Sequence, residues 1–226
     1  MTAAAPRLYL VAAFLGEIMA VIVAFGDSNT WGYDPARGAR FAPDIRWTGV
    51  LAAALGPAHR VIEEGLNGRT TVFVDPIEPD RRGADYLPPC LRSHAPLDLL
   101  IIALGCNDMK ARFNVSAAEI AFGAERLVAI AQAEPVGPNG APPRVLLVAP
   151  PPVARLTGFA DMFRGAEAKS LEIAARYAEV AERRGIGFVD AGQFIRCSDL
   201  DGIHYEADSH TLLGHAMAQA VRMVLE

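Results

Sequence analysis

Five residues spread along the chain have the types and the order needed for acyl transfer through a serine. This chemistry needs a nucleophile, a base, a group that orients the base, and donors that stabilise the oxyanion. Ser28 could supply the nucleophilic hydroxyl, His204 could accept its proton, and Asp201 could hold the imidazole in the productive tautomer. The backbone N–H groups of Ser28 and Gly68, with the side-chain amide of Asn107, could bind the oxyanion. Gly68 leaves room for the carbonyl because it has no side chain.

Short apolar segments alternate with amphipathic segments along the chain, which is typical of an α/β fold. The apolar segments are nearly continuous in Val, Ile and Leu, and this composition predicts parallel strands covered on both faces. Strands are predicted at 20–25, 60–64, 98–104, 144–149 and 186–190. Helices are predicted at 47–55, 116–133, 161–184 and 207–225. We therefore expect a three-layer α/β/α domain with a five-stranded, flavodoxin-like parallel sheet and right-handed crossovers.

The candidate residues fall where these strands end. Ser28 follows the first strand, Gly68 the second and Asn107 the third. Asp201 and His204 lie between the fifth strand and the last helix. Because ligands bind beyond the carboxyl ends of parallel strands, we expect all five residues to meet at one edge of the sheet.

The blocks around these residues resemble those of the SGNH, or GDSL-type, hydrolases. The four blocks, in the order of that family, are GDS at 26–28, Gly68, GCND at 105–108 and DGIH at 201–204. Longer stretches are similar to the bacterial arylesterase branch, which includes acyltransferase and perhydrolase enzymes; they are 41–51, 61–71 and 201–205. The resemblance covers residues 20–226.

The resemblance implies an SGNH fold and a serine carboxylester hydrolase that acts on small esters through an acyl-enzyme. Acyl transfer to alcohols or peroxide is implied as a second outcome. Ser28, Asp201 and His204 would form the triad, and Ser28, Gly68 and Asn107 the oxyanion hole. This branch often forms octamers, so the resemblance also implies a homo-oligomer.

Residues near these blocks predict the pocket. Trp31, in the turn after the nucleophile, is a candidate apolar wall, and Asn67 and Arg69 would keep one side polar. Nothing in the sequence indicates a lid helix or a long apolar channel, so we expect short acyl groups, acetyl to butyryl. Asn29 and Cys106 depart from the family, which usually has leucine and often has threonine there. Neither is expected to take a catalytic role.

Other functions would leave signatures in the sequence. A phosphate- or nucleotide-binding module would need a G-x-x-x-x-G-K-[ST] or G-x-G-x-x-G loop, and an α/β-hydrolase a G-x-S-x-G elbow; none is present. A carbohydrate O-deacetylase of the same fold stays open, because the SGNH family includes such enzymes. A zinc site from His204, Asp208 and His210 lacks the H-E-x-x-H pattern, and Cys106 has no assigned base. We therefore expect no metal and no cofactor.

The composition limits the partners and the compartment. The chain has 226 residues and a formal charge of -5 without Lys/Arg runs, so neither nucleic acid nor a membrane surface is an expected partner. A small ester is the expected partner. Cys90, Cys106 and Cys197 are far apart and odd in number, which fits a reducing, cytoplasmic location and predicts no disulfide framework.

The N-terminal segment carries a conflicting signal. Residues 8–26 are apolar except for Glu17, as in a membrane span, and Arg7 before them resembles the start of a signal peptide. Residues 20–25 are also needed as the first core strand, and no small-x-small cleavage site with a spacer precedes them. We therefore expect residues 1–18 to be an appendage, or to arise from an upstream start before Met19. Residues 19–226 would form the hydrolase domain, with a signal peptide as the alternative.

Overall fold

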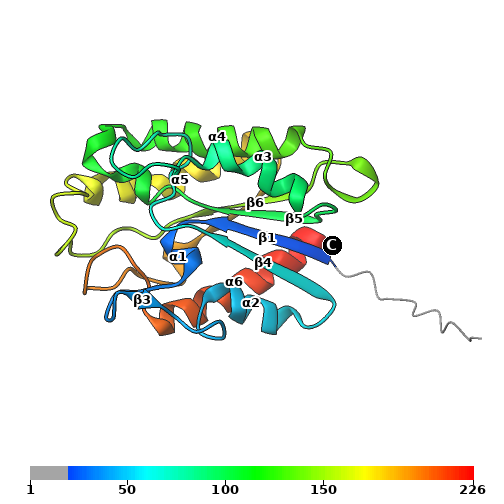
Figure 1. Cartoon of the computed structure of the whole chain (residues 1–226), viewed down its shortest axis with the longest axis horizontal. Coiled ribbons are helices and arrows are strands. Elements are labelled where there is room, and N and C mark those ends of the chain that lie inside the picture. Colours follow the sequence, from blue (N-terminus) through cyan, green and yellow to red (C-terminus); the bar gives the residue numbers. More distant parts are fainter. Residues whose placement is uncertain (1–19) are drawn as a thin grey trace, which may run out of the picture.

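A parallel sheet of five strands forms the centre of the computed structural model, which describes residues 20–226 (Figure 1). The strand order is β4-β1-β5-β6-β7, and every neighbouring pair is parallel. The strands are β1 Ala20–Gly26, β4 His59–Gly65, β5 Leu99–Ala103, β6 Arg144–Ala149 and β7 Gly187–Asp190. The predicted sheet is therefore confirmed. The chain reverses its direction of strand addition at β1, and such a switch point is where open α/β sheets bind ligands.

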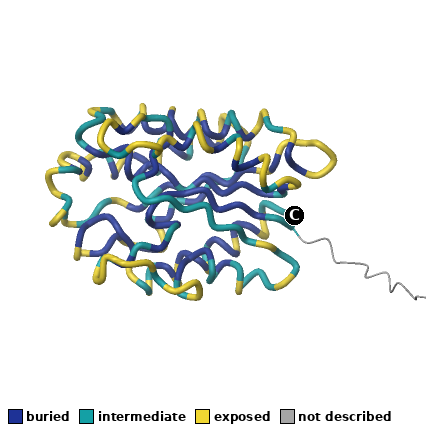
Figure 2. Tube along the Cα trace, viewed as in Figure 1, coloured by how far each residue is buried: buried dark blue, intermediate teal, exposed yellow. Residues whose placement is uncertain are grey.

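Helices cover both faces of the sheet (Figure 1). One layer contains α3 Gly83–Ser93, α4 Ala117–Ala133 and α5 Ala166–Arg184; the other contains α2 Trp47–Leu55 and α6 Ala207–Leu225. Alternate residues of β1 enter the two cores, since Val23 and Phe25 pack in the first layer and Ile22 and Ala24 in the second. Both faces are thus buried (Figure 2), which explains the continuous apolar segments of the sequence.

Two helices differ from their prediction. Helix α3 lies in a region where no helix was predicted, because Pro88 and Pro89 lie inside it and proline normally marks a helix boundary. Helix α5 starts at Ala166 rather than at residue 161, because Gly165 before it adopts a φ of 83° outside the helical range. By contrast, α4 begins within one residue of its predicted start, where Ser116 and Glu119 form a capping box.

Three short elements follow β1, at the carboxyl edge of the sheet. Helix α1 spans Ser28–Trp31, and β2 Tyr33–Asp34 pairs with β3 Ala39–Arg40 in a separate antiparallel ribbon. Three-residue 3₁₀ turns at Asn107–Met109, Ala111–Phe113, Pro138–Gly140 and Ala191–Gln193 shape the other loops.

The N-terminal prediction is tested only from Ala20 onward. Ile22, Val23, Ala24 and Phe25 are fully buried in β1, so residues 20–25 form a core strand as predicted. The predicted appendage, residues 1–18, and Met19 lie outside the described residues. Among the helices of residues 20–226, none has the length and apolar character needed to cross a membrane.

Candidate active site

Ser28 is the first residue of α1, in the turn that follows β1. The carboxylate of Asp27 caps this helix, since its Oδ1 accepts the Asn29 N–H at 2.9 Å. The turn passes very close to the end of β4, where a Cβ on Gly65 would lie 2.2 Å from the backbone nitrogen of Trp31. Only glycine fits at that contact. The close packing fixes the position of Ser28 at the carboxyl edge of the sheet.

His204 links Ser28 to Asp201 through hydrogen bonds at both ring nitrogens. Its Nε2 lies 2.9 Å from Ser28 Oγ, and its Nδ1 lies 2.6 Å from Asp201 Oδ2. The other oxygen of Asp201 accepts the backbone N–H groups of Ile203 and His204, both at 2.9 Å. Burial alone would raise the pKa of Asp201, but the hydrogen bonds from His204 and the backbone hold it below its ordinary value. A charged carboxylate therefore stays beside the imidazole.

Gly68 and Asn107 reach the same place from two other strand ends. Asn107 follows β5, and its Nδ2 donates to Asp27 Oδ2 at 3.4 Å. Gly68 lies in the loop after β4 with a φ of 79°, a left-handed conformation that favours glycine. No acceptor within residues 20–226 takes a hydrogen bond from its N–H. Both residues line one pocket with Ser28 and His204.

Two buried aspartates tie these loops together. Asp27 bridges the turn that begins at Ser28 and Asn107, and burial raises the pKa of Asp27 to about 6. Asp108 accepts the Thr71 N–H at 3.0 Å and the Thr71 hydroxyl, and burial raises its pKa to about 6 as well. Asp108 thereby joins the loop after β5 to the loop after β4. Sequence spacing gives no signal of this contact, because Thr71 is 37 positions away.

The pocket that contains Ser28 and His204 is a small cavity of about 140 Å³. The rings of Tyr33 and Phe159 flank the imidazole, with centroids 4.2 and 5.9 Å from that of His204. Pockets for drug-sized ligands usually exceed about 300 Å³, so this one fits a short acyl group rather than a long chain. Its apolar side is Tyr33, Phe159, Met162 and Phe163, and its polar side is Asn67, Glu78 and Lys110.

Ion pairs around the buried Lys110 and Asp75 hold the polar side in place. Lys110 is 2% exposed, and its Nζ lies 2.5 Å from Glu78 Oε2 and 3.5 Å from Asp75 Oδ2. The guanidinium of Arg112 lies 2.7 Å from each of the same two carboxylates. Burial alone would raise the pKa of Asp75, but backbone hydrogen bonds and the two cations hold it below its ordinary value. This cluster was not predicted, because its members are 32–37 residues apart and their pattern is that of ordinary loop charges.

Of the three residues predicted for substrate contact, Asn67 lines the pocket, whereas Trp31 and Arg69 do not. The Trp31 ring lies against Arg40, whose guanidinium is 5.1 Å from the ring centroid. Arg69 is buried, stacks 4.2 Å from the Phe25 ring centroid, and donates to the last carbonyl of β1 at 2.9 Å. Nearness in sequence suggested both contacts, but the Trp31 ring packs against Arg40 of β3, and the Arg69 guanidinium binds carbonyls at the ends of β1 and β4.

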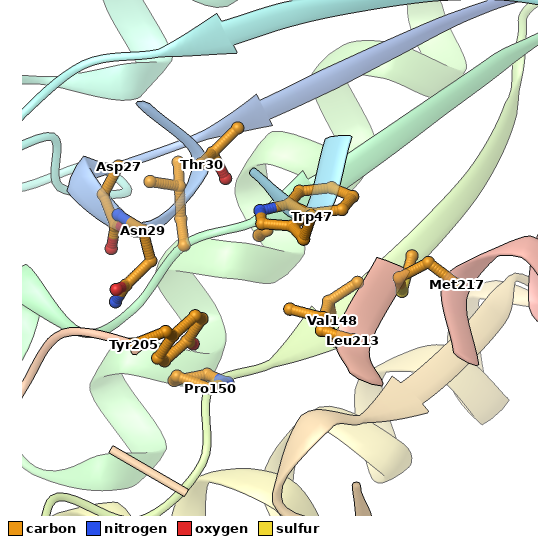
Figure 3. Close-up of a pocket in the computed structure, with 11 residues that line it drawn as sticks. Asp27, Asn29, Thr30, Trp47, Val148, Pro150, Tyr205, Leu213 and Met217 are labelled. Atoms are coloured by element: carbon orange, nitrogen blue, oxygen red, sulfur yellow. Dashed lines mark hydrogen bonds between the residues drawn. The ribbon is translucent and has the colours of Figure 1, made fainter. Parts of the chain in front are cut away.

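A second cavity lies behind the nucleophile turn, toward α6 (Figure 3). It measures about 20 Å³, which is room for about one water molecule. Asn29 lines it, and its buried Oδ1 has no hydrogen-bond partner among residues 20–226. Trp47, Tyr205 and Met217 form much of the wall. Because the cavity is small and neither Ser28 nor His204 lines it, an ester does not bind there.

The alternative assignments meet specific obstacles. Both nitrogens of His204 are engaged by Ser28 and Asp201, and His210 Nδ1 accepts the Trp47 N–H at 3.2 Å. Among residues 20–226, His204, Asp208 and His210 do not bring three ligand atoms within 4.8 Å of one another, so the structure does not assemble the zinc set considered from the sequence. Burial raises the pKa of the Cys106 thiol well above its ordinary value, so this thiol is protonated and unreactive.

Comparisons with known proteins agree with this geometry. Residues 24–216 match the model of the GDSL-like lipase/acylhydrolase family. The native aryl esterase of M. smegmatis is 45% identical, with a TM-score of 0.87 over 91% of this chain and 99% of that chain. Est24, a carbohydrate acetylesterase from Sinorhizobium meliloti, is 40% identical, with a TM-score of 0.87 over 90% and 99%. No curated protein matches the chain.

The chain therefore belongs to the GDSL-like lipase/acylhydrolase family, as the sequence blocks predicted, and it has the SGNH fold. It is a carboxylic ester hydrolase.

Proposed function

We propose that this esterase cleaves small, short-chain esters, aryl acetates among them, with Ser28 as the nucleophile. The observation that supports this most strongly is the unbroken chain of hydrogen bonds from Ser28 Oγ through His204 to Asp201. A serine hydroxyl is a weak nucleophile unless a base removes its proton during attack. Here the base is already in hydrogen-bond contact, and a carboxylate orients it.

Acylation would begin with attack of Ser28 Oγ on the ester carbonyl while His204 Nε2 takes the hydroxyl proton. Asp201 keeps the Nδ1 proton in place and stabilises the imidazolium. The negative oxygen of the tetrahedral intermediate would be bound by the N–H groups of Ser28 and Gly68 and by the Asn107 amide. Collapse of this intermediate expels the alcohol, which receives the proton from His204.

Deacylation would repeat these steps with a second nucleophile. Water attacks the acyl-Ser28 while His204 takes one of its protons, and the carboxylic acid leaves. An alcohol bound in place of water would give a new ester. The apolar wall formed by Phe159, Met162 and Phe163 offers such an alcohol a surface from which water is excluded. We therefore propose acyl transfer to small alcohols as a side reaction.

Turnover of p-nitrophenyl acetate, butyrate and octanoate tests the acyl preference. Because the cavity is small, kcat/KM should be highest for acetate or butyrate and fall steeply for octanoate. Product analysis with phenyl acetate and benzyl alcohol in buffer tests transfer, and benzyl acetate should appear beside acetic acid. A preference for octanoate would contradict the small-pocket argument, and acid alone at every alcohol concentration would leave a plain hydrolase.

The polar side of the pocket favours a second candidate, a carbohydrate O-deacetylase. Asn67, Glu78 and Lys110 could hydrogen-bond to the hydroxyls of a sugar acetate. A matched comparison of phenyl acetate with an acetylated sugar separates the two functions. An aryl esterase should have the higher kcat/KM for phenyl acetate. Lys110→Met should change kcat/KM for phenyl acetate less than it changes kcat/KM for the acetylated sugar.

A further inference from the structure

A thiol, an imidazole and a carboxylate meet in a part of the molecule that the proposed mechanism does not use. Glu64 lies at the end of β4, Cys90 lies in α3, and His94 caps the C-terminal end of that helix. Cys90 and His94 are four residues apart, so they share one face of the helix. One potential ligand atom from each of the three residues lies within 4.8 Å of the other two.

The group is accessible to a small ion. The side chains of Glu64 and His94 are 19% and 23% exposed, whereas Cys90 is fully buried behind them. Glu64 and Tyr86 also line an open groove of about 750 Å³. An ion that enters from the groove would therefore meet the carboxylate of Glu64 first. A water molecule from the same groove could complete a four-coordinate shell.

We propose that Glu64, Cys90 and His94 bind a divalent transition-metal ion, with Zn²⁺ as the favoured occupant. Zinc takes Cys sulfur, His nitrogen and carboxylate oxygen in tetrahedral geometry, and three protein ligands plus a water are a common set. His94 would bind through Nε2, the atom that lies 2.7 Å from Glu64 Oε1, with its proton on Nδ1. The S–H bond of Cys90 breaks as the metal–sulfur bond forms, and the proton passes to solvent. Thiolate and carboxylate together neutralise the ion.

The surroundings select for a metal that binds sulfur strongly. Cys90 is fully buried, so an ion that binds there must replace the thiol proton with a strong bond to sulfur. Mg²⁺ and Ca²⁺ prefer oxygen ligands and would gain little from the thiol.

The apo form needs no metal to satisfy these groups. The Tyr86 hydroxyl donates to Glu64 Oε2 at 3.3 Å, and His94 pairs with the other oxygen. The metal should therefore add stability without being required for folding or for ester turnover.

Titration of the metal-free full chain with Co²⁺ tests the site, because a cobalt–thiolate bond gives a near-ultraviolet charge-transfer absorption. Wild type should bind one equivalent with this absorption, and Zn²⁺ should displace it. Cys90→Ser should abolish the absorption, and His94→Gln should weaken cobalt binding by at least about 100-fold, since even loss of outer hydrogen-bond partners costs 10–100-fold. Both variants conserve size or hydrogen bonding, so unchanged p-nitrophenyl acetate turnover should show that they fold.

Cys197→Ser and His215→Ala are the matched controls, since they remove a buried thiol and an exposed imidazole elsewhere. Both should bind cobalt as wild type does. The proposal is overturned if wild type binds no equivalent of cobalt, if the bound ion lacks thiolate absorption, or if Cys90→Ser and His94→Gln bind as tightly as wild type.

Discussion

Residues 20–226 contain two histidine–carboxylate pairs with nearly equal hydrogen-bond lengths and very different surroundings. His204 lies 2.6 Å from Asp201, and His94 lies 2.7 Å from Glu64. In the first pair, the free imidazole nitrogen faces the hydroxyl of Ser28. In the second pair, the nitrogen that faces the carboxylate is Nε2, and the nearby nucleophile is a buried thiol. The pair alone therefore does not define a catalytic site.

The group beside each pair, the Ser28 hydroxyl or the Cys90 thiol, and its position in the fold decide the chemistry. Ser28 stands at the carboxyl edge of the sheet and lines an open pocket, and the N–H groups of Ser28 and Gly68 have no acceptor among residues 20–226. Cys90 has no exposed surface, and burial raises its pKa to about 12, so its thiolate is not formed near neutral pH. The first arrangement suits acyl transfer. The second suits a metal that can displace the thiol proton.

The largest effect should come from breaking the catalytic pair. Ser28→Ala and His204→Ala should each lower kcat for p-nitrophenyl acetate by about 10⁴–10⁶-fold, because each removes the proton-transfer unit. The double variant should be no worse than either single variant. Steady-state kinetics with circular dichroism as the folding check measures this. A double variant far slower than both singles would mean that the two residues act independently.

The same carboxylate-to-amide change should separate the two pairs. Asp201→Asn should lower kcat by about 10⁴-fold, because an amide favours the wrong imidazole tautomer. Glu64→Gln should leave turnover close to wild type. Kinetics of the two variants side by side provides the test, and equal losses would show that the second pair also supports catalysis.

Asn107 should show an intermediate effect. Its amide matters mainly when negative charge develops on the carbonyl oxygen, so Asn107→Ala should lower kcat by about 10²–10³-fold with little change in KM. Separate values of kcat and KM for phenyl acetate decide the point. An effect on KM alone would make Asn107 a ground-state binding residue.

A third histidine, His210, extends the comparison because no carboxylate within residues 20–226 pairs with it. Burial lowers the pKa of His210 from 6.5 to about 4, and the charges of His204 and Arg46 add to this shift. In the unfolded chain His210 takes up a proton near pH 6.5, whereas in the folded chain it stays neutral down to about pH 4. The folded state is therefore not penalised by this residue above pH 6.5. As the pH falls from 6.5 toward 4, the free energy of unfolding decreases by about 3 kcal/mol because only the unfolded chain gains this proton.

His210→Asn should reduce that loss, because the amide oxygen can still accept the Trp47 N–H but does not titrate in this range. Urea unfolding of both proteins between pH 7 and 4 measures it. Parallel falls in the free energy of unfolding would mean that His210 is charged in the folded state.

The sequence predicts most of the sheet because burial on both faces imposes long apolar strands. It also predicts which residues the structure brings together around Ser28, since each lies beyond a strand end and matches a family block; their catalytic roles stay predictions. The sequence does not predict α3, because its two prolines are not typical of a helix. It therefore does not predict that Cys90 and His94 lie near Glu64. Contacts that depend on loop conformation, such as Lys110 with Glu78, are missed for the same reason. The oligomeric state and the cellular location stay predictions.

Covalent labelling tests the central claim most directly. A p-nitrophenyl phosphonate forms a stable adduct with an activated serine, and peptide mass analysis locates it. Wild type should carry one adduct, on the peptide that contains Ser28, and His204→Ala should be labelled far more slowly. Glu64→Gln and Cys90→Ser should be labelled at the wild-type rate. An adduct on another residue, or labelling of Ser28 that does not depend on His204, would contradict the assignment.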